Sequence, residues 1–303
     1  MQKKWSVAFL GPEGTHSHEA CRRYCRDDFV PVPCASPREV MEKLDQAGAP
    51  VDVAVVPVEN SIEGPVTQTL DELAAHRNLR IGAAFQMRIK NHLLARDVAV
   101  PFADIRRVCS HPQAMAQCRL WLDRHLPHAE RMMTASTSEA AGLAAQDATV
   151  AAVAGSSAAQ VYKLAVRAEA IQDRQDNTTR FLVLYHPDRA AGFSPSCPPG
   201  VDKDVRALFY LTLPNQPGAL LAALRPFNVH GVNMTFIQSR PLVNRPWEYA
   251  FFIETEKAGA PGDESRLMAD LKKVTDELHC MGVYPLQQLP GEPAVRTGPE
   301  GAV

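Results

Sequence analysis

The chain has 303 residues, of which 46% are hydrophobic and 22% are charged, and its formal net charge is -2. This length and apolar content provide for one large domain or two smaller ones and argue against overall disorder. The near-zero net charge gives no broad basic field, so neither nucleic acid nor membrane is an expected partner and any anion must be recognised by local groups.

The start of the chain and its cysteines indicate the compartment. The apolar run at residues 7–10 is too short for the core of a signal peptide, and no stretch approaches the length of a membrane span. The seven cysteines are odd in number and scattered, without a CxxC pair, which argues against a disulfide framework and a zinc cluster. We therefore expect a cytoplasmic protein without a metal.

Short apolar runs alternate with helix-like segments through the first part of the chain. The runs are residues 7–10, 51–56, 108–110, 132–135, 150–153 and 180–184. The helix-like segments are residues 17–26, 66–76, 112–124 and 158–164. A further helix starts at Ser136, with Glu139 at the spacing of a capping box. This alternation predicts an α/β domain.

A proline- and glycine-rich segment at residues 188–203 predicts a linker to a second domain at residues 204–288. There the predicted elements follow the order β-α-β-β-α-β, which is ferredoxin-like. They lie at residues 205–213, 218–228, 232–240, 247–254, 264–281 and 283–287. The tail at residues 289–303 has few large apolar side chains and is expected to be disordered.

Four polar loops follow predicted strands, where helix N-termini direct free N–H groups at a ligand. The loops are Gly11-Pro12-Glu13-Gly14-Thr15-His16-Ser17, Pro57-Val58-Glu59-Asn60-Ser61, Ser110-His111-Pro112-Gln113 and Ala135-Ser136-Thr137-Ser138. Neither GxGxxG nor GxxxxGK[ST] occurs, so a small molecule is expected instead of a dinucleotide or nucleoside triphosphate. Hydroxyl residues at helix starts are usually only caps, but four such loops together favour a site.

Several polar residues of these segments are consistent with either a ligand-binding role or a purely structural one. Asn60 and Glu59 either form a turn that satisfies local backbone groups or face a ligand. Gln113 either points into a cleft or solvates the first turn of a helix. Thr179 and Arg180 stand at the start of a strand, where a hydroxyl and a guanidinium suit protonating one group and gripping a carboxylate. The polar run before them is equally consistent with a solvated connection.

Taken together, these motifs resemble the prephenate dehydratase family over residues 7–287. The resemblance rests on Gly11-Pro12-Glu13-Gly14-Thr15, Val56-Pro57-Val58-Glu59-Asn60-Ser61 with Glu63-Gly64, Ser110-His111-Pro112-Gln113-Ala114 and Asn177-Thr178-Thr179-Arg180-Phe181. It implies a two-lobed catalytic domain at residues 1–187, similar to periplasmic binding proteins. Lobe 1 would comprise about residues 1–78 and 159–187, and lobe 2 about residues 79–158, with crossings near Asn78 and Ala159.

The implied activity converts prephenate to phenylpyruvate with loss of water and CO2, and it needs no cofactor. On this resemblance Thr179 assists the departure of the hydroxyl group, Asn60 and Gln113 fix substrate oxygens, and Glu59 is an acid or an orienting residue. The implied substrate-binding residues are Thr15, Ser17, Ser61, Ser110, His111, Arg180 and Phe181.

The C-terminal part resembles the ACT domain that members of this family carry. The resemblance rests on Pro217-Gly218-Ala219-Leu220 and Gln238-Ser239-Arg240-Pro241. It implies L-phenylalanine as an effector bound between paired ACT domains, and a homodimer or homotetramer. A chorismate mutase segment is not recognised before the first motif, so a monofunctional enzyme is expected.

Three positions depart from the family pattern. His16 stands where the family usually has Phe or Tyr, Ala84 replaces a common glutamate, and Gln238 replaces the glutamate before Ser-Arg-Pro. The last change bears on the affinity for phenylalanine. Three alternatives remain open: an arogenate dehydratase, a decarboxylase that does not aromatise prephenate, and a non-catalytic amino-acid sensor. Retention of Thr179-Arg180-Phe181 speaks against the second, and the lack of a DNA-binding motif leaves the third without an output.

Overall fold

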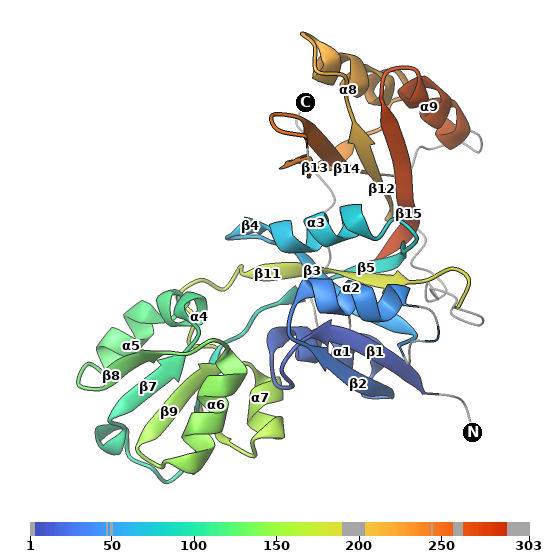
Figure 1. Cartoon of the computed structure of the whole chain (residues 1–303). Helices are drawn as coiled ribbons and strands as arrows, with labels where there is room; N and C mark the ends of the chain where they lie inside the picture. Colours follow the sequence, from blue (N-terminus) through green and yellow to red (C-terminus); the bar gives the residue numbers. More distant parts are fainter. Residues whose placement is uncertain are drawn as a thin grey trace.

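The computed structural model describes residues 4–46, 48, 51–189, 204–243, 245–256 and 263–289. The predicted linker at residues 188–203 and tail at residues 289–303 therefore lie almost entirely outside the described residues. The described residues form one ten-stranded and one five-stranded sheet. Figure 1 shows three parts: a central lobe 1, a lobe 2 built from the green segments and a C-terminal domain in orange and red.

Lobe 1 is built on the sheet order β5-β11-β3-β1-β2. Its strands are β1 (Trp5–Leu10), β2 (Phe29–Cys34), β3 (Val53–Asn60), β4 (Gly64–Pro65), β5 (Arg80–Arg88) and β11 (Thr178–Tyr185). Its helices are α1 (His16–Cys25), α2 (Pro37–Asp45) and α3 (Thr67–Ala75). The long strand β11 runs antiparallel to both β3 and β5, so the end of the domain returns to the middle of the sheet.

Lobe 2 is built on the sheet order β10-β6-β9-β7-β8. Its strands are β6 (His92–Ala95), β7 (Arg107–Ser110), β8 (Glu130–Met133), β9 (Val150–Ala154) and β10 (Ala165–Ala168). Its helices are η1 (Phe102–Asp104), α4 (Pro112–Gln117), α5 (Arg119–His125), α6 (Thr137–Gln146) and α7 (Ser156–Val161). The predicted alternation of strands and helices is confirmed, although the helix expected at residues 112–124 is broken at Cys118.

The chain crosses between the lobes at different points from those expected. Strand β5 pairs with β11 and belongs to lobe 1, whereas β10 pairs with β6 and belongs to lobe 2. The crossings therefore lie at residues 89–91 and 169–177, and the boundaries predicted near Asn78 and Ala159 are wrong. Both errors arise because strand pairing between distant segments decides which lobe a strand joins, and no local pattern encodes that pairing.

The C-terminal domain confirms the predicted β-α-β-β-α-β order. Its elements are β12 (Val205–Thr212), α8 (Ala219–Val229), β13 (Met234–Pro241), β14 (Tyr249–Glu256), α9 (Asp263–Lys272) and β15 (Glu277–Gln288). The sheet order is β13-β14-β12-β15, and all of these pairs are antiparallel. The last helix ends at Lys272, earlier than predicted, because the chain enters a longer final strand at Glu277.

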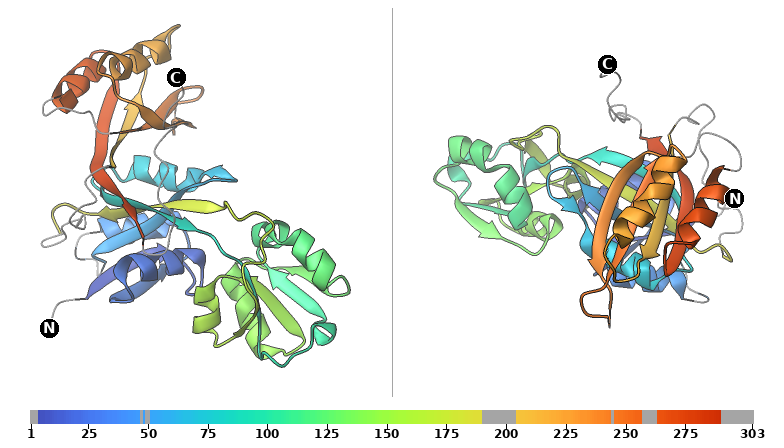
Figure 2. Two further views of the ribbon diagram at one scale, coloured as in Figure 1. Left: turned by 180° about the vertical axis from the view of Figure 1, so that it is seen from behind. Right: turned by 90° about the horizontal axis from the view of Figure 1, so that it is seen from above.

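The C-terminal domain shares a sheet and a core with lobe 1. The end of β15 pairs in parallel with β5, where Leu286 lies opposite Ala84. One hydrophobic core contains Tyr210 and Phe252 of the C-terminal domain together with Met41 and Leu70 of lobe 1. Both views in Figure 2 place the C-terminal domain and lobe 2 on different sides of lobe 1. Across the described ranges, no helix is long and apolar enough to cross a membrane.

Candidate functional site

A cavity of about 620 Å³ lies between lobe 1 and lobe 2. All four polar loops contribute to its wall, so the structure brings them together at one cavity. The lining residues from these loops are Gly11, Thr15, His16, Ser17, Pro57, Asn60, His111, Gln113, Ala135, Ser136 and Thr137. Thr179 and Phe181 on β11 complete the wall beside them.

Two ten-residue helices begin at this cavity, one from each lobe. Thr15 caps α1 by accepting from the His18 N–H at 3.3 Å, and Ser136 caps α6 by accepting from the Glu139 N–H at 3.0 Å. Neither lysine nor arginine occurs among the described residues that line the cavity. The free N–H groups and positive dipole ends of α1 and α6 are therefore the main electropositive groups offered to an anion.

The side chain of Asn60 is fixed by the backbone. Its Oδ1 accepts the N–H groups of Ile62 at 3.0 Å and Glu63 at 3.1 Å, so its Nδ2 must point the other way. Nδ2 donates to Asn177 Oδ1 at 2.8 Å and to Thr179 Oγ1 at 2.9 Å. Both lone pairs and both hydrogens of this amide are thus engaged. Asn60 orients its neighbours and has no group left for a substrate oxygen, which corrects the role expected for it.

The hydroxyl of Thr179 is consequently a hydrogen-bond donor to the cavity. Its oxygen already accepts from Asn60 Nδ2, and in the described part of the chain its hydrogen has no acceptor. Thr179 is 8% exposed and lines the cavity. A bound molecule with an oxygen at this point would receive the hydroxyl hydrogen, which is the arrangement needed to assist a departing oxygen.

Four further predicted residues line the cavity with different capacities. Ser17 and Gln113 have side chains without a hydrogen-bond partner within the described ranges, so they are available to a ligand. His111 accepts the Gln113 N–H at Nδ1, which leaves its Nε2 as a donor when the ring is neutral. Thr15 donates to the Leu10 carbonyl at 3.0 Å and is occupied as a cap.

The loop that leads into α1 is held in place by buried groups. His18 accepts the Gly14 N–H at Nδ1 with a distance of 3.0 Å, and burial lowers the pKa of His18, which keeps this nitrogen unprotonated. Gly14 has φ +91, and a Cβ there would lie 2.9 Å from Ser138 Oγ, so a glycine is required. The Ser138 hydroxyl donates to the Glu13 carbonyl and thereby links the two lobes.

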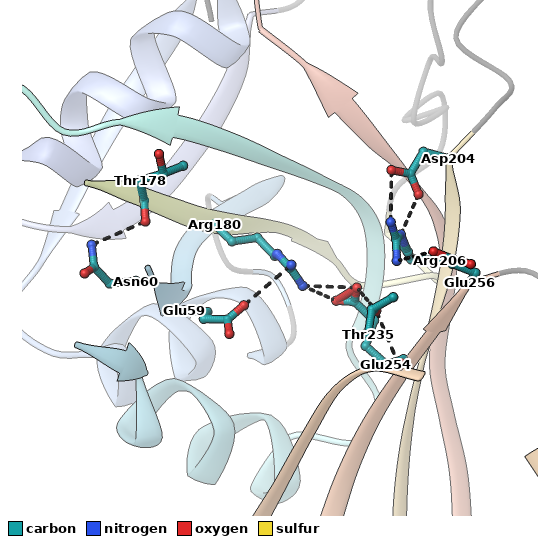
Figure 3. Close-up of polar contacts among 9 residues, drawn as sticks. All are labelled: Glu59, Asn60, Thr178, Arg180, Asp204, Arg206, Thr235, Glu254 and Glu256. Carbon is teal, nitrogen blue, oxygen red and sulfur yellow. Dashed lines mark hydrogen bonds and ion pairs between the residues drawn. The ribbon is translucent and has the colours of Figure 1, made fainter. Parts of the chain in front are cut away.

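Arg180 and Glu59 do not line the cavity. Figure 3 shows their side chains on the side of lobe 1 that faces Glu254 of the C-terminal domain. Arg180 Nη1 contacts Glu254 Oε2 at 2.7 Å on β14, and its Nη2 lies 3.5 Å from Glu59 Oε2. Successive side chains of a strand point to opposite faces, so Thr179 and Arg180 cannot both face one ligand. Neither side chain lines the cavity, so of the roles expected for Arg180 and Glu59 this arrangement favours supporting or orienting the site over contacting a substrate.

Two predicted serines are also absent from the cavity wall. The Ser110 hydroxyl is fully buried and donates to the Val153 carbonyl at 2.7 Å. The Ser61 hydroxyl donates to the Asp176 carbonyl at 3.1 Å and accepts the Thr178 N–H at 3.0 Å. Both hydroxyls form hydrogen bonds with backbone groups, so their role in this structure is local and not toward a ligand.

Four carboxamides not assigned from the sequence line the same cavity: Gln68, Asn91, Gln117 and Asn177. Asn91 and Asn177 lie on the two crossing segments, and Gln117 ends α4. Asn177 was recognised only as part of a motif. Asn91 carried no local signal, because its position depends on where the chain crosses between lobes.

The two segments expected to bind phenylalanine lie at one end of the C-terminal sheet. Thr212 ends β12, before the turn into α8, and Arg240 lies near the end of β13. Both residues pair with Ala250 of β14, so β14 is the single strand that separates the two segments. Gly218 caps α8 with φ +83, which favours glycine. Arg240 also forms an ion pair with Asp71 of α3 at 2.6 Å.

The two-lobed α/β domain and its inter-lobe cavity define a small-molecule site of the kind found at the carboxyl ends of sheet strands. A model of the prephenate dehydratase family matches residues 7–189. The chain is 34% identical over 300 residues to the prephenate dehydratase of Mycobacterium tuberculosis strain H37Rv, covering 97% of this chain and 89% of that protein. The chain belongs to the prephenate dehydratase family.

The chain is also similar to two further proteins named as prephenate dehydratases and to one protein named as an acylase. A bifunctional chorismate mutase/prephenate dehydratase of Aquifex aeolicus is 36% identical over 285 residues, covering 94% of this chain and 75% of that protein. A solved prephenate dehydratase from Arthrobacter aurescens in complex with L-Phe has a TM-score of 0.80 and 32% identity, covering 96% and 93% of the two chains. A quorum-quenching acylase, GqqA, has a TM-score of 0.78 and 28% identity, covering 93% and 98%.

Removal of Arg180 tests the ion pair behind the cavity. Arg180→Gln leaves the carboxylate of Glu254, whose side chain is 5% exposed, without its cation, so we expect a loss of roughly 3 kcal/mol in the free energy of unfolding in urea. Arg174→Gln is the control, because the pair of Arg174 with Asp176 has side chains that are 63% and 67% exposed. Its expected loss is much smaller, because solvent screens an exposed ion pair. Equal effects of the two substitutions would contradict this placement of Arg180.

Proposed function

We propose that this protein is a prephenate dehydratase, which converts prephenate to phenylpyruvate, water and CO2. The observation that carries this proposal is the Thr179 hydroxyl, whose hydrogen is left free for a ligand by the orientation of Asn60. Family membership supplies the substrate class. The likeness of the two lobes to periplasmic binding proteins is part of the proposal, and it is supported by two crossing segments that flank one cavity.

The substrate is a dianion, and the site would hold it largely without cationic side chains. The N-termini of α1 and α6 approach the cavity from opposite lobes, which suits a molecule with two carboxylates. Ser17 and Gln113 are the side chains best placed to add hydrogen bonds. Binding would draw the lobes together on the ligand, since each carboxylate would engage a different lobe.

The reaction balances as prephenate dianion plus one proton giving phenylpyruvate anion, CO2 and water. The bond from the ring to the leaving carboxylate breaks, and its electron pair restores the aromatic ring while the bond to the ring hydroxyl breaks. Thr179 donates a hydrogen bond to that departing oxygen, and water supplies the net proton. The aromatic ring formed provides the driving force, so the protein contributes orientation and the donor.

Other activities receive less support from the cavity. Within the described part of the wall, no hydroxyl is hydrogen-bonded to an imidazole, the arrangement that would activate an acylase nucleophile. The nearby thiol of Cys118 is buried, and this burial raises its pKa to about 12. Arogenate differs from prephenate by an amino group in place of the keto group, and comparing turnover of the two compounds decides between them.

We further propose that the C-terminal domain is an ACT domain that transmits the binding of L-phenylalanine. Its βαββαβ order supports this assignment, as does the L-Phe bound to the Arthrobacter relative. The route would run from β14 through Glu254 to Arg180, whose contact Figure 3 shows, and Arg180 follows Thr179 on β11. The relevant assembly would be a homodimer or homotetramer, for which β13 offers a sheet edge with Ile237 48% exposed.

Thr179→Val tests the catalytic hydroxyl because it preserves the shape of a β-branched side chain. We expect kcat for phenylpyruvate formation to fall about 100-fold or more, with little change in the Kd for prephenate measured by calorimetry. Thr178→Val is the matched control, since the Thr178 hydroxyl contacts the Asp176 carbonyl and does not line the cavity. Normal turnover by Thr179→Val would sink the assignment.

Glu254→Gln tests the route between the domains because it keeps the shape of the side chain and removes its charge. We expect the phenylalanine concentration that halves the activity to rise about 10-fold, in line with coupling energies of 1–3 kcal/mol. Glu256→Gln on the same strand is the control, because its partner Arg206 keeps a 2.5 Å contact with Asp204. If both variants retained wild-type inhibition, the route through Arg180 would have to be abandoned.

A further inference from the structure

Helix α3 connects the cavity to the C-terminal domain. At its N-terminal end, Val66, Thr67 and Gln68 line the cavity. One turn further along, Asp71 accepts two hydrogen bonds from Arg240 of β13, at 2.7 Å from Nε to Oδ1 and at 2.6 Å from Nη2 to Oδ2. Figures 1 and 2 both show α3 between the C-terminal domain and β11. One short helix therefore contacts both the cavity and the C-terminal domain.

The partner of Asp71 belongs to Ser239-Arg240-Pro241, the segment expected to bind the effector. Two parallel N–H···O bonds between a guanidinium and a carboxylate fix the orientation of two elements as well as their distance. The side chains of Arg240 and Asp71 are 25% and 45% exposed, and such a pair contributes little to stability. A shared core and the pairing of β15 with β5 already dock the two domains. The pair is therefore better suited to linking positions than to holding the domains together.

The two ends of α3 are held differently. Beyond its C-terminal end, Arg77 Nη1 contacts Glu277 Oε2 of β15 at 2.6 Å, and Arg77 lies 4.6 Å from the ring centroid of Tyr210. At the N-terminal end, Val66 provides no side-chain cap, so the first turn lacks the hydrogen bond that usually fixes a helix start. A force applied at Asp71 therefore moves the N-terminal end of α3, which is the end at the cavity.

The loop that precedes α3 determines the orientation of Asn60. The N–H groups of Ile62 and Glu63 in this loop donate to Asn60 Oδ1 at 3.0 and 3.1 Å, and Asn60 Nδ2 donates to Thr179 Oγ1 at 2.9 Å. Hydrogen bonds weaken steeply when their angles change. A displacement at the start of α3 therefore changes the two backbone donors that direct the amide of Asn60 at Thr179.

We propose that Asp71 is a positioning residue, which couples the effector segment to the hydroxyl of Thr179 through α3. When the effector binds, Arg240 shifts and draws the start of α3 with it, and the preceding loop turns Asn60 away from Thr179. This inference rests on the proposed function, because it takes L-phenylalanine as the effector. It differs from the route through β14, which reaches the Thr179 end of the same hydrogen bond.

Asp71→Asn is the direct test, because it removes the charge of the pair and leaves Arg240 of the effector segment unchanged. We expect phenylalanine to bind with a Kd within about 3-fold of wild type by calorimetry, and kcat without phenylalanine to stay within about 3-fold. The fold-inhibition of prephenate turnover by saturating phenylalanine should fall about 5-fold or more. Asp71→Glu, which keeps the carboxylate, should retain inhibition.

Glu72→Gln is the matched control on the same helix, because the Glu72 carboxylate lies 3.7 Å from His76 Nδ1, one turn later in the chain. It should leave inhibition at the wild-type level. Loss of phenylalanine binding in Asp71→Asn overturns the inference, because Asp71 would then only shape the effector site. Wild-type inhibition in both Asp71→Asn and Asp71→Ala also overturns it. Wild-type protein that turns over prephenate without responding to phenylalanine would instead remove the proposed regulation and this inference together, so the failures are distinguishable.

Discussion

The hydrogen bond from Asn60 Nδ2 to Thr179 Oγ1 is the interaction on which the site depends. It is 2.9 Å long and its direction is set by the N–H groups of Ile62 and Glu63, which bind the other end of the amide. A threonine hydroxyl is a very weak acid, so its usefulness lies in the direction of its hydrogen. By occupying the oxygen of Thr179, Asn60 commits that hydrogen to the cavity.

Strands β3 and β11, which carry Asn60 and Thr179, also connect the site to the C-terminal domain. On β3 and β11 the residues that face the cavity, Asn60 and Thr179, alternate with Glu59 and Arg180, which face β14. Because the end of β15 pairs with β5, the C-terminal sheet continues into the sheet that carries Thr179. One buried ion pair, between Glu254 and Arg180, therefore separates β14 from the residue next to Thr179.

Local signals in the sequence predicted much of the fold and the location of the site. Caps such as Ser136 with Glu139, the polar loops after strands and the βαββαβ order of the C-terminal domain depend on residues close in sequence. The lobe boundaries could not be predicted, since they depend on β5 pairing with β11 across about 100 residues of sequence. Thr179 and Arg180 alternate along β11, so only Thr179 lines the cavity and Arg180 reaches Glu254, a partner distant in sequence that no local pattern indicates.

The free hydrogen of Thr179 is tested most directly by measuring the turnover of prephenate by Asn60→Asp. One carboxylate oxygen would keep the N–H groups of Ile62 and Glu63, and the other would accept the hydroxyl hydrogen of Thr179. We expect kcat to fall about 100-fold or more although Thr179 is present and the protein melts as a folded domain. A folded Asn60→Asp protein with kcat near that of the wild type would contradict it.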